Sequence, residues 1–275
     1  MKALKKNLQH DLSTKELKNL RASFDMIGDI AILEVPRELT KKQKLIAARV
    51  LEQHPNLHVI AKKKGGHAGK YRRQKLQWLA GQKRFETVHK ESGVVMRLDV
   101  EKCYYSQRMS TERARIAQLI QSGEEVLVLF SGIAPYPLVL AKQSPAKHIT
   151  AVEMNPVAHK YATENVKLNK LEHKITLLKG NASRIVPKLR QKFDRIIMVL
   201  PRSASRYLAH ALRVAKPHTF MHVYAFAKEN EFEKAGRKVQ QICARFKKPC
   251  HVLRIVKAGQ NAPRQYRVCV DAQVE

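Results

Sequence analysis

The C-terminal two-thirds of the chain predicts an α/β fold with a parallel, doubly wound sheet. From residue 112 onward, short apolar stretches alternate with helical patterns, several of them about 10–15 residues long. Strands that are covered by helices on both faces consist of apolar runs of this kind. The N-terminal third lacks this alternation, and its short strand-like pieces predict a separate, small α+β domain.

In the C-terminal part, the expected elements follow one another closely. Apolar runs define the strands, and apolar residues at helical spacing define most of the helices. The expected elements, in chain order, are helix 112–121, strand 125–130, helix 137–142, strand 148–152, helix 156–169, strand 175–178, a helical turn at 185–189, strand 194–200, helix 204–214, strand 220–226, helix 229–244, strand 250–256 and a final strand 266–271.

The N-terminal part is expected to hold an arm and a small domain. Residues 1–20 are polar and rich in Lys and Leu, which predicts one short helix or a loose arm. The elements expected after it are strand 29–35, helix 39–53, strand 58–61, a basic segment 61–85 whose first part is flexible, and strand-like pieces at 87–89, 93–98 and 103–105. The predicted boundaries are an arm at 1–22, the small domain at 23–105 and the α/β domain at 106–275.

The charge of the chain indicates a polyanionic partner. It has 53 Lys and Arg residues against 23 Asp and Glu residues, which gives a formal net charge of +30. A field of this size attracts phosphate backbones and speeds association with them. The alternative is a protein kept soluble in a salty or hot cell, but such proteins balance their lysines with glutamates, and this chain does not.

The cysteines and the hydropathy of the chain indicate where it resides. The four cysteines form no CxxC pair and have no zinc-like spacing with His, so we expect buried thiols in a reducing compartment and no metal. The N-terminus is basic but no apolar run follows it, and no stretch approaches the roughly 18 apolar residues of a membrane span. We expect a soluble, cytoplasmic, monomeric protein without a membrane partner.

Segment 61–85 is the candidate RNA-binding surface. It holds nine basic residues and no acid, with Gly65, Gly66 and Gly69 that make its first part flexible and with Tyr71 and Trp78 interleaved. Mobile cations with occasional stacking rings suit an RNA backbone; the alternative is a solvated loop. The residues expected to contact RNA are Lys62, Lys63, Lys64, Lys70, Arg72 and Arg73.

Ligands of doubly wound sheets bind beyond the carboxyl ends of the strands. The turn Phe130–Tyr136 follows the first strand there, and Gly132 allows the backbone to pass close to a ligand. Glu153 ends the second strand, 21 residues after Gly132, near the spacing of about 20 at which a carboxylate holds the ribose of a nucleoside cofactor. The alternative for Glu153 is a carboxylate that stabilises the start of the next helix.

The next two strands end in further candidate residues. Asn181 and Ala182 follow the third strand, where an amide side chain could recognise an adenine edge. Pro201 lies after the fourth strand, in the usual place for residues that contact the molecule to which a group is transferred. The sequence has no GxGxxG motif, which argues against a nicotinamide enzyme.

Several motifs resemble those of one enzyme family, over roughly residues 23–230. Tyr104–Arg115 resembles the Y-x-S/N-P-R-L-S-T-E-R-x-R signature of the archaeal and eukaryotic tRNA guanosine-37 N1-methyltransferase family. The other similar segments are Phe130–Tyr136 to F-A-G-V-G-P-F/Y, Glu153–Pro156 to D/E-x-N-P, Glu164–Asn169 to E-N-x-K-L-N, and Met198–Pro201 to M-N-L-P.

The resemblance implies a Rossmann-like class I methyltransferase that binds S-adenosyl-L-methionine and tRNA and methylates N1 of guanosine 37. It implies that Arg108 holds the guanine O6 while N1 loses its proton, a role that suits a planar donor of fixed charge. The alternative for Arg108 is an RNA phosphate contact or an ion pair. Pro201 is expected on the side of the nucleotide that accepts the methyl group. The residues expected to bind the cofactor are Phe130, Gly132, Pro135, Tyr136, Glu153, Met154, Asn181 and Ala182.

The chain also departs from the family pattern. Val128 replaces an acid, Ala134 a glycine, Val199 the asparagine of M-N-L-P and Gln107 a proline. Because only about 20 residues precede the region of likeness, we expect the family's N-terminal tRNA-elbow domain to be missing. The alternatives are therefore an aminocarboxypropyl transferase of wybutosine synthesis, although its usual Gly-Asn near the arginine is absent, and a non-catalytic RNA-binding relative. Glu112 is either a general base or an ion-pair partner, and we favour the structural role.

Overall fold

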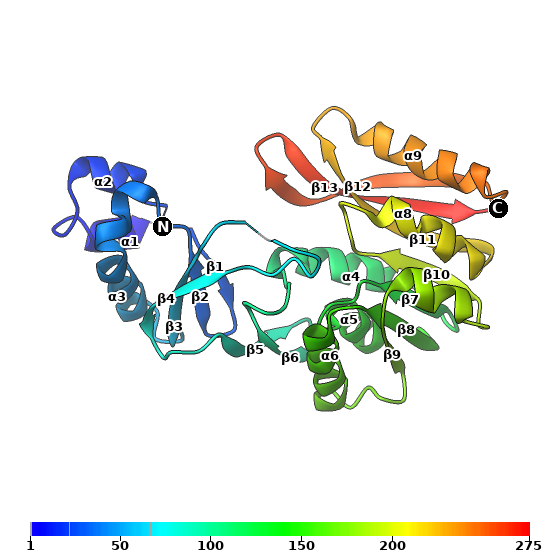
Figure 1. The fold of residues 1–275 in the computed structure, drawn as a ribbon, viewed down its shortest axis with the longest axis horizontal. Helices are drawn as coiled ribbons and strands as arrows, with labels where there is room; N and C mark the ends of the chain where they lie inside the picture. Colours follow the sequence, from blue (N-terminus) through cyan, green and yellow to red (C-terminus); the bar gives the residue numbers. More distant parts are fainter. Residues whose placement is uncertain (1, 22, 67) are drawn as a thin grey trace. The chain divides into compact units, whose positions relative to one another are not determined.

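The computed structural model describes residues 2–21, 23–66 and 68–275, which form two compact units (Figure 1). The first unit consists of Met1–Lys90 with Val95–Gln107, and the second of Glu91–Val94 with Arg108–Glu275. None of the helices over the described residues has the length and apolar character that crossing a membrane requires.

The first unit contains a four-stranded sheet in the order β1-β2-β3-β4. Only β2 and β3 pair in parallel, because η1 and α3 lie between them in the chain and allow the crossover. Its elements are α1 (Lys2–Asn7), α2 (Thr14–Asn19), β1 (Asp25–Ile27), β2 (Ile30–Leu33), η1 (Arg37–Lys42), α3 (Gln43–Gln53), β3 (Val59–Lys63) and β4 (Leu76–Gly81). A hairpin of β5 (Glu86–Glu91) and β6 (Val94–Asp99) follows, and its tip belongs to the second unit.

The first twenty residues form two short helices instead of a loose arm. Leu4, Leu8, Leu12 and Leu20 are buried in the same apolar core as residues of α3 and of the sheet. A capping box between Ser13 and Glu16 begins α2. Burial of these leucines is the physical reason why the segment is ordered.

Two further features of this unit differ from the expectation. The basic segment contains a strand that was not expected, β4, whose Leu76 and Leu79 are buried. These leucines are three residues apart, and the register of β4 against β3 shifts between Trp78 and Ala80, so Leu79 is an extra residue in the strand. Residues 103–105 form no strand, because Asp99 Oδ1 accepts hydrogen bonds from the amides of Glu101 and Lys102 and turns the chain directly after β6.

The second unit contains a seven-stranded sheet in the order β12-β13-β11-β10-β7-β8-β9. The chain passes outward from β7 to β9 on one side and from β10 to β11 on the other, so the order switches between β7 and β10 (Figure 1). The strands are β7 (Glu125–Leu129), β8 (His148–Glu153), β9 (Ile175–Lys179), β10 (Phe193–Met198), β11 (Ala215–Lys228), β12 (Cys250–Ala262) and β13 (Gln265–Val274).

Helices separate the strands, as predicted, and the fold class is confirmed. α4 packs against α5, and α8 packs against α9 and β11. The helices are η2 (Gln107–Met109), α4 (Ser110–Gln118), α5 (Pro135–Gln143), α6 (Pro156–Leu168), α7 (Ala182–Ile185), η3 (Val186–Lys188), α8 (Ala204–Arg213) and α9 (Phe232–Arg245).

One strand, β13, departs from the predicted parallel arrangement. This strand runs antiparallel to both β11 and β12. Only Pro263 and Arg264 separate β12 from β13, and Arg264 has a φ of 54°. So short a connection can only join antiparallel neighbours.

Candidate active site

The turn after β7 has an unusual backbone. Phe130, Gly132 and Ala134 have φ values of 65°, 58° and 71°, in the left-handed region. A residue with a Cβ pays about 1–2 kcal/mol for this conformation, and such strain is typical of ligand-binding turns. Ala134, which departs from the family's glycine, therefore keeps the conformation in which a glycine would be preferred.

This turn is tied to the end of β8. The amides of Phe130 and Ser131 both donate to the carbonyl of Val152, over 2.9 and 3.1 Å. The amide of Gly132 donates to Glu153 Oε2 over 2.7 Å. The structure therefore brings together two of the residues predicted for the cofactor, with the Gly132 amide directed at the Glu153 carboxylate.

Glu153 is partly buried and is held by backbone amides. Its Oε1 accepts a hydrogen bond of 2.6 Å from the amide of Asn155. Burial raises the pKa of Glu153, and the amides of Asn155, Gly132 and Met154 oppose the shift. A carboxylate offers about four lone-pair positions, so both oxygens retain capacity for a further donor such as a ribose hydroxyl.

The end of β9 joins the same edge. The amide of Gly180 donates to the carbonyl of Glu153 over 2.9 Å. Asn181 caps α7 by accepting from the amide of Ser183 over 3.1 Å, which leaves its carboxamide NH2 as a donor. Met154 follows Glu153 and is partly exposed, whereas Ala182 is buried in α7.

The aromatic residues of the turn face the interior of the unit. Tyr136 is 3% exposed, and its hydroxyl donates to the Tyr224 hydroxyl over 2.8 Å. The Phe130 ring packs edge-on against Tyr207. Pro135 begins α5 and is partly exposed. Tyr136 therefore exposes little surface, and its place among the cofactor residues stays a prediction.

Glu112 is engaged as a structural residue. Its Oε1 accepts from the Tyr224 hydroxyl over 2.7 Å, and its two oxygens receive Nη2 and Nε of Arg115 over 2.7 and 2.8 Å. Arg115 also binds Asp271 over 2.6 Å. These contacts favour the ion-pair role over that of a general base.

The two residues predicted on the acceptor side lie at the ends of elements. Arg108 is exposed on η2, directly before α4, and Pro201 follows β10 and is partly buried. The contacts of Glu112 and Arg115 hold α4, and therefore the segment that carries Arg108. That Arg108 and Glu153 face one cleft stays a prediction.

The basic residues of the first unit differ in what they contact. Lys64, Lys70 and Arg73 are exposed, and Lys62 is half-buried on β3. Lys63 Nζ binds Asp25 and Glu34 over 3.0 and 2.9 Å. Two of the cations lie over rings: the Arg72 guanidinium is 4.9 Å from the centre of the Tyr104 ring, and Lys70 Nζ is 5.9 Å from that of Tyr71.

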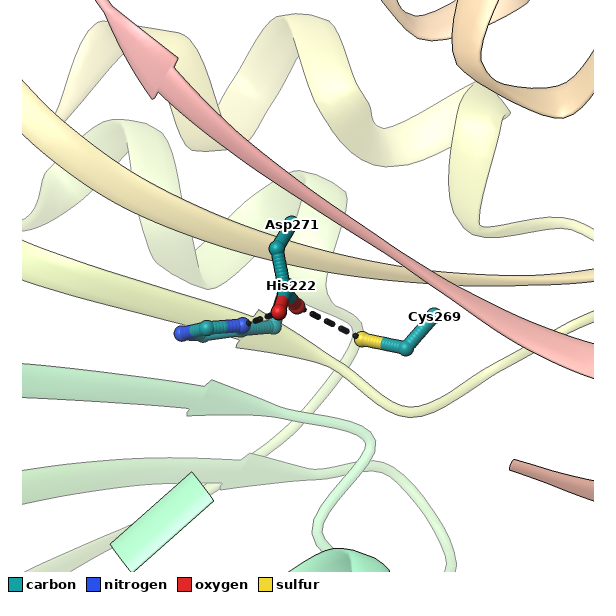
Figure 2. Close-up of side chains that lie close together, drawn as sticks. All are labelled: His222, Cys269 and Asp271. Carbon is teal, nitrogen blue, oxygen red and sulfur yellow. Dashed lines mark hydrogen bonds and ion pairs between the residues drawn. The ribbon is translucent and has the colours of Figure 1, made fainter. Parts of the chain in front are cut away.

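A buried cluster on β11 and β13 was not predicted from the sequence (Figure 2). His222 Nδ1 lies 2.6 Å from Asp271 Oδ1, to which the Cys269 thiol donates over 3.2 Å. The other ring nitrogen of His222 contacts Arg195 over 2.7 Å. The register pairs His222 with Asp271, so the strand alignment creates the cluster.

This cluster has the residue types of a metal site but not its chemistry. A metal would need a thiolate and an imidazole nitrogen with a free lone pair. Burial raises the pKa of Cys269 well above its ordinary value, and both nitrogens of His222 have partners. Arg115 and Arg254 already bind the carboxylate of Asp271. We therefore assign the cluster to a buried hydrogen-bonded network.

Comparison with known families yields two adjoining matches. The TRM5/TYW2 methyltransferase domain matches residues 87–253, and the TYW2 N-terminal domain matches residues 4–84.

Curated relatives carry two activities. The chain is 36% identical over 256 residues to the tRNA (guanine(37)-N(1))-methyltransferase Trm5b of Pyrococcus abyssi, covering 93% of the chain and 76% of that protein. It is 30% identical over 253 residues to the tRNA(Phe) (4-demethylwyosine(37)-C(7)) aminocarboxypropyltransferase of Methanocaldococcus jannaschii, covering 92% and 98%.

Solved structures of relatives have the same fold. Wild-type Trm5b from Pyrococcus abyssi aligns with a TM-score of 0.86 at 35% identity, over 96% of the chain and 78% of that structure. The complex of aTrm5 with tRNALeu aligns with a TM-score of 0.85 at 29% identity, over 99% and 78%. M. jannaschii TYW2 in complex with AdoMet aligns with a TM-score of 0.71 at 25% identity, over 92% and 99%.

Proposed function

Because the chain belongs to the TRM5/TYW2 methyltransferase family, we propose that it transfers the methyl group of S-adenosylmethionine to N1 of guanosine 37 in tRNA. The family makes it an S-adenosylmethionine-dependent enzyme of tRNA modification. The observation that carries the proposal is the hydrogen bond of 2.7 Å from the Gly132 amide to the Glu153 carboxylate. It joins the turn after β7 to the carboxyl end of β8.

The residues at this edge fit the cofactor. Glu153 keeps room for a ribose hydroxyl, since the backbone amides that it binds do not use all of the roughly four lone-pair positions of its two oxygens. Ser131 Oγ is buried in the same turn and has no hydrogen-bond partner among the described residues. When bound, S-adenosylmethionine supplies an electrophilic carbon next to a positively charged sulfur.

The remaining tasks belong to side chains near the acceptor. Methyl transfer needs alignment of the nucleophile with the transferred carbon and removal of one proton. We assign to Arg108 the binding of the guanine O6, where negative charge accumulates as N1 loses its proton. Pro201 would border the acceptor base, because it follows β10, the strand next to β7.

A second candidate is aminocarboxypropyl transfer with the same cofactor. The match of residues 4–84 to the TYW2 N-terminal domain favours it, as does the 30% identity to the M. jannaschii aminocarboxypropyltransferase. Val199 also replaces the asparagine of the methyltransferase pattern. We rank it second, since identity to Trm5b is higher over a similar length.

One assay separates the two candidates. tRNA is incubated with the protein and with cofactor that carries its label either in the methyl group or in the carboxyl group. Methyl transfer predicts that only the methyl label enters tRNA, and nuclease digestion then places it on guanosine 37. Incorporation of the carboxyl label alone would reverse the ranking.

A further inference from the structure

A cavity of about 740 Å³ lies at the C-terminal half of β11 in the second unit. The loop after β10, with Pro201 and Arg202, borders it on one side, and the first turns of α9 and the ends of the β12–β13 hairpin border it elsewhere. Its volume falls in the range of roughly 300–1,000 Å³ that small-ligand sites occupy. Through Pro201 the cavity adjoins the place proposed for the acceptor base.

The walls of this cavity carry an excess of positive charge. Four basic side chains line it, against one carboxylate, that of Glu231. Lys234 Nζ binds Glu231 Oε1 over 2.7 Å, and this hydrogen bond lowers the pKa of Glu231. Lys234 is therefore neutralised, so Arg202, Lys228 and Lys238, all exposed, supply the excess charge.

The other lining residues suit a larger ligand than a simple anion. Ala225, Phe226 and Val239 give the cavity an apolar part. Asn261 and Gln265 lie at its rim, where Asn261 Nδ2 donates to Gln265 Oε1 over 2.9 Å and leaves the Gln265 NH2 as a donor. Cations beside apolar and amide surface match a phosphate that is attached to a sugar and a base.

We propose that this cavity binds the phosphate and sugar of a nucleotide that neighbours the modified one in the substrate RNA. The inference rests on the proposed function, because it places the acceptor nucleotide next to Pro201. It adds a second RNA contact that the charge of segment 61–85 does not provide. Phosphate contacts of this kind fix the register of the RNA without reading its sequence.

A matched pair of double variants tests the cavity. Lys228→Gln with Lys238→Gln removes two of its cations, and Lys167→Gln with Arg237→Gln removes two exposed cations outside it. The dissociation constant for tRNA is measured at several KCl concentrations, and that for S-adenosylhomocysteine at one. For the cavity variant we expect a salt slope shallower by about 1–2, at least fivefold weaker tRNA binding and unchanged S-adenosylhomocysteine binding.

Equal slopes for the two double variants would overturn the inference. In a second arm, tRNAs carrying one methylphosphonate beside the target nucleotide remove a single phosphate charge. At one position, the methylphosphonate should weaken tRNA binding to the wild type. The same methylphosphonate should weaken binding to the cavity variant little further, since the change in the tRNA and the change in the protein delete the same contact. Additive losses of affinity would contradict the inference. A wild type that modifies tRNA but fails both arms rejects the cavity alone, whereas one that binds no tRNA rejects the proposed function as well.

Discussion

Two carboxylates of the seven-stranded sheet show how similar groups are used differently. Glu153 ends β8 and is bound by backbone amides, and burial raises its pKa. Asp271 lies on β13, where burial also opposes its charge, but hydrogen bonds from His222, Arg115 and Arg254 hold its pKa well below the ordinary range.

The partners explain the difference. Asp271 is saturated, because two guanidinium groups, a ring nitrogen and a thiol already use its lone pairs. Glu153 receives neutral donors only and keeps room for more. A buried carboxylate that the protein saturates stabilises the fold, whereas one that it leaves incompletely bonded is available to a ligand.

The largest effect is expected from Asp271→Asn. Removing one partner from a buried ionic network leaves the remaining charges uncompensated and costs about 3–5 kcal/mol. We expect the free energy of unfolding, measured with urea at neutral pH, to fall by this amount. Glu172→Gln, at an exposed site of the same unit, is the control and should change it little.

The pH dependence of stability follows from the same shift. Because the pKa of Asp271 is lower in the folded state, its contribution is present above the ordinary aspartate pKa of about 3.9. It should be lost as the pH falls further towards the folded-state pKa. Wild type and Asp271→Asn should therefore converge in stability under acid, and a constant difference down to low pH would contradict the assignment.

Arg108 lies directly before α4, the helix that the Asp271 network holds through Arg115. Arg108→Ala should reduce turnover at least about a hundredfold, while the dissociation constant for tRNA changes little. Arg108→Lys should restore only part of the rate, because a lysine lacks the planar pair of donors. Arg213→Ala, at an exposed position of α8, is the matched control. A loss confined to tRNA affinity would make Arg108 a phosphate contact.

The smallest effects are expected from the basic segment of the first unit. Replacing the exposed Lys64, Lys70 and Arg73 with glutamine should weaken tRNA binding and reduce the salt slope by about 1–3. Lys63→Gln should change the slope less and stability more, since Lys63 binds Asp25 and Glu34. If Lys63→Gln reduces the salt slope as much as the triple variant does, the ion pairs of Lys63 do not keep it from contacting tRNA.

The sequence predicts best those elements in which the buried residues are apolar and the exposed residues are polar. β7 and β8 are apolar runs, and the turn between β7 and α5 contains the glycine expected beside Glu153. β4 was missed because cations surround its two buried leucines, and a strand with exposed lysines beside it resembles a loop.

The buried network could not be predicted from the sequence. Arg195 is 2% exposed and Asp271 is 3% exposed, although charged residues are normally expected at the surface. Their burial depends on partners that lie far away in the chain, Glu124 for Arg195 and Arg115 for Asp271. Such pairs arise from strand order and register, which a single sequence does not specify.

The most direct test of the proposed cofactor site is to measure by calorimetry how tightly S-adenosylhomocysteine binds to the wild type and to a variant of Glu153. We predict that the wild type binds it and that Glu153→Gln binds it at least about tenfold more weakly, a loss of about 1.4 kcal/mol. Because burial raises the pKa of Glu153, wild-type affinity should decline on acidification at a higher pH than for an ordinary glutamate, and the glutamine variant should lack this decline. A wild type with no detectable binding at millimolar ligand, or a variant that binds equally well, would contradict the account.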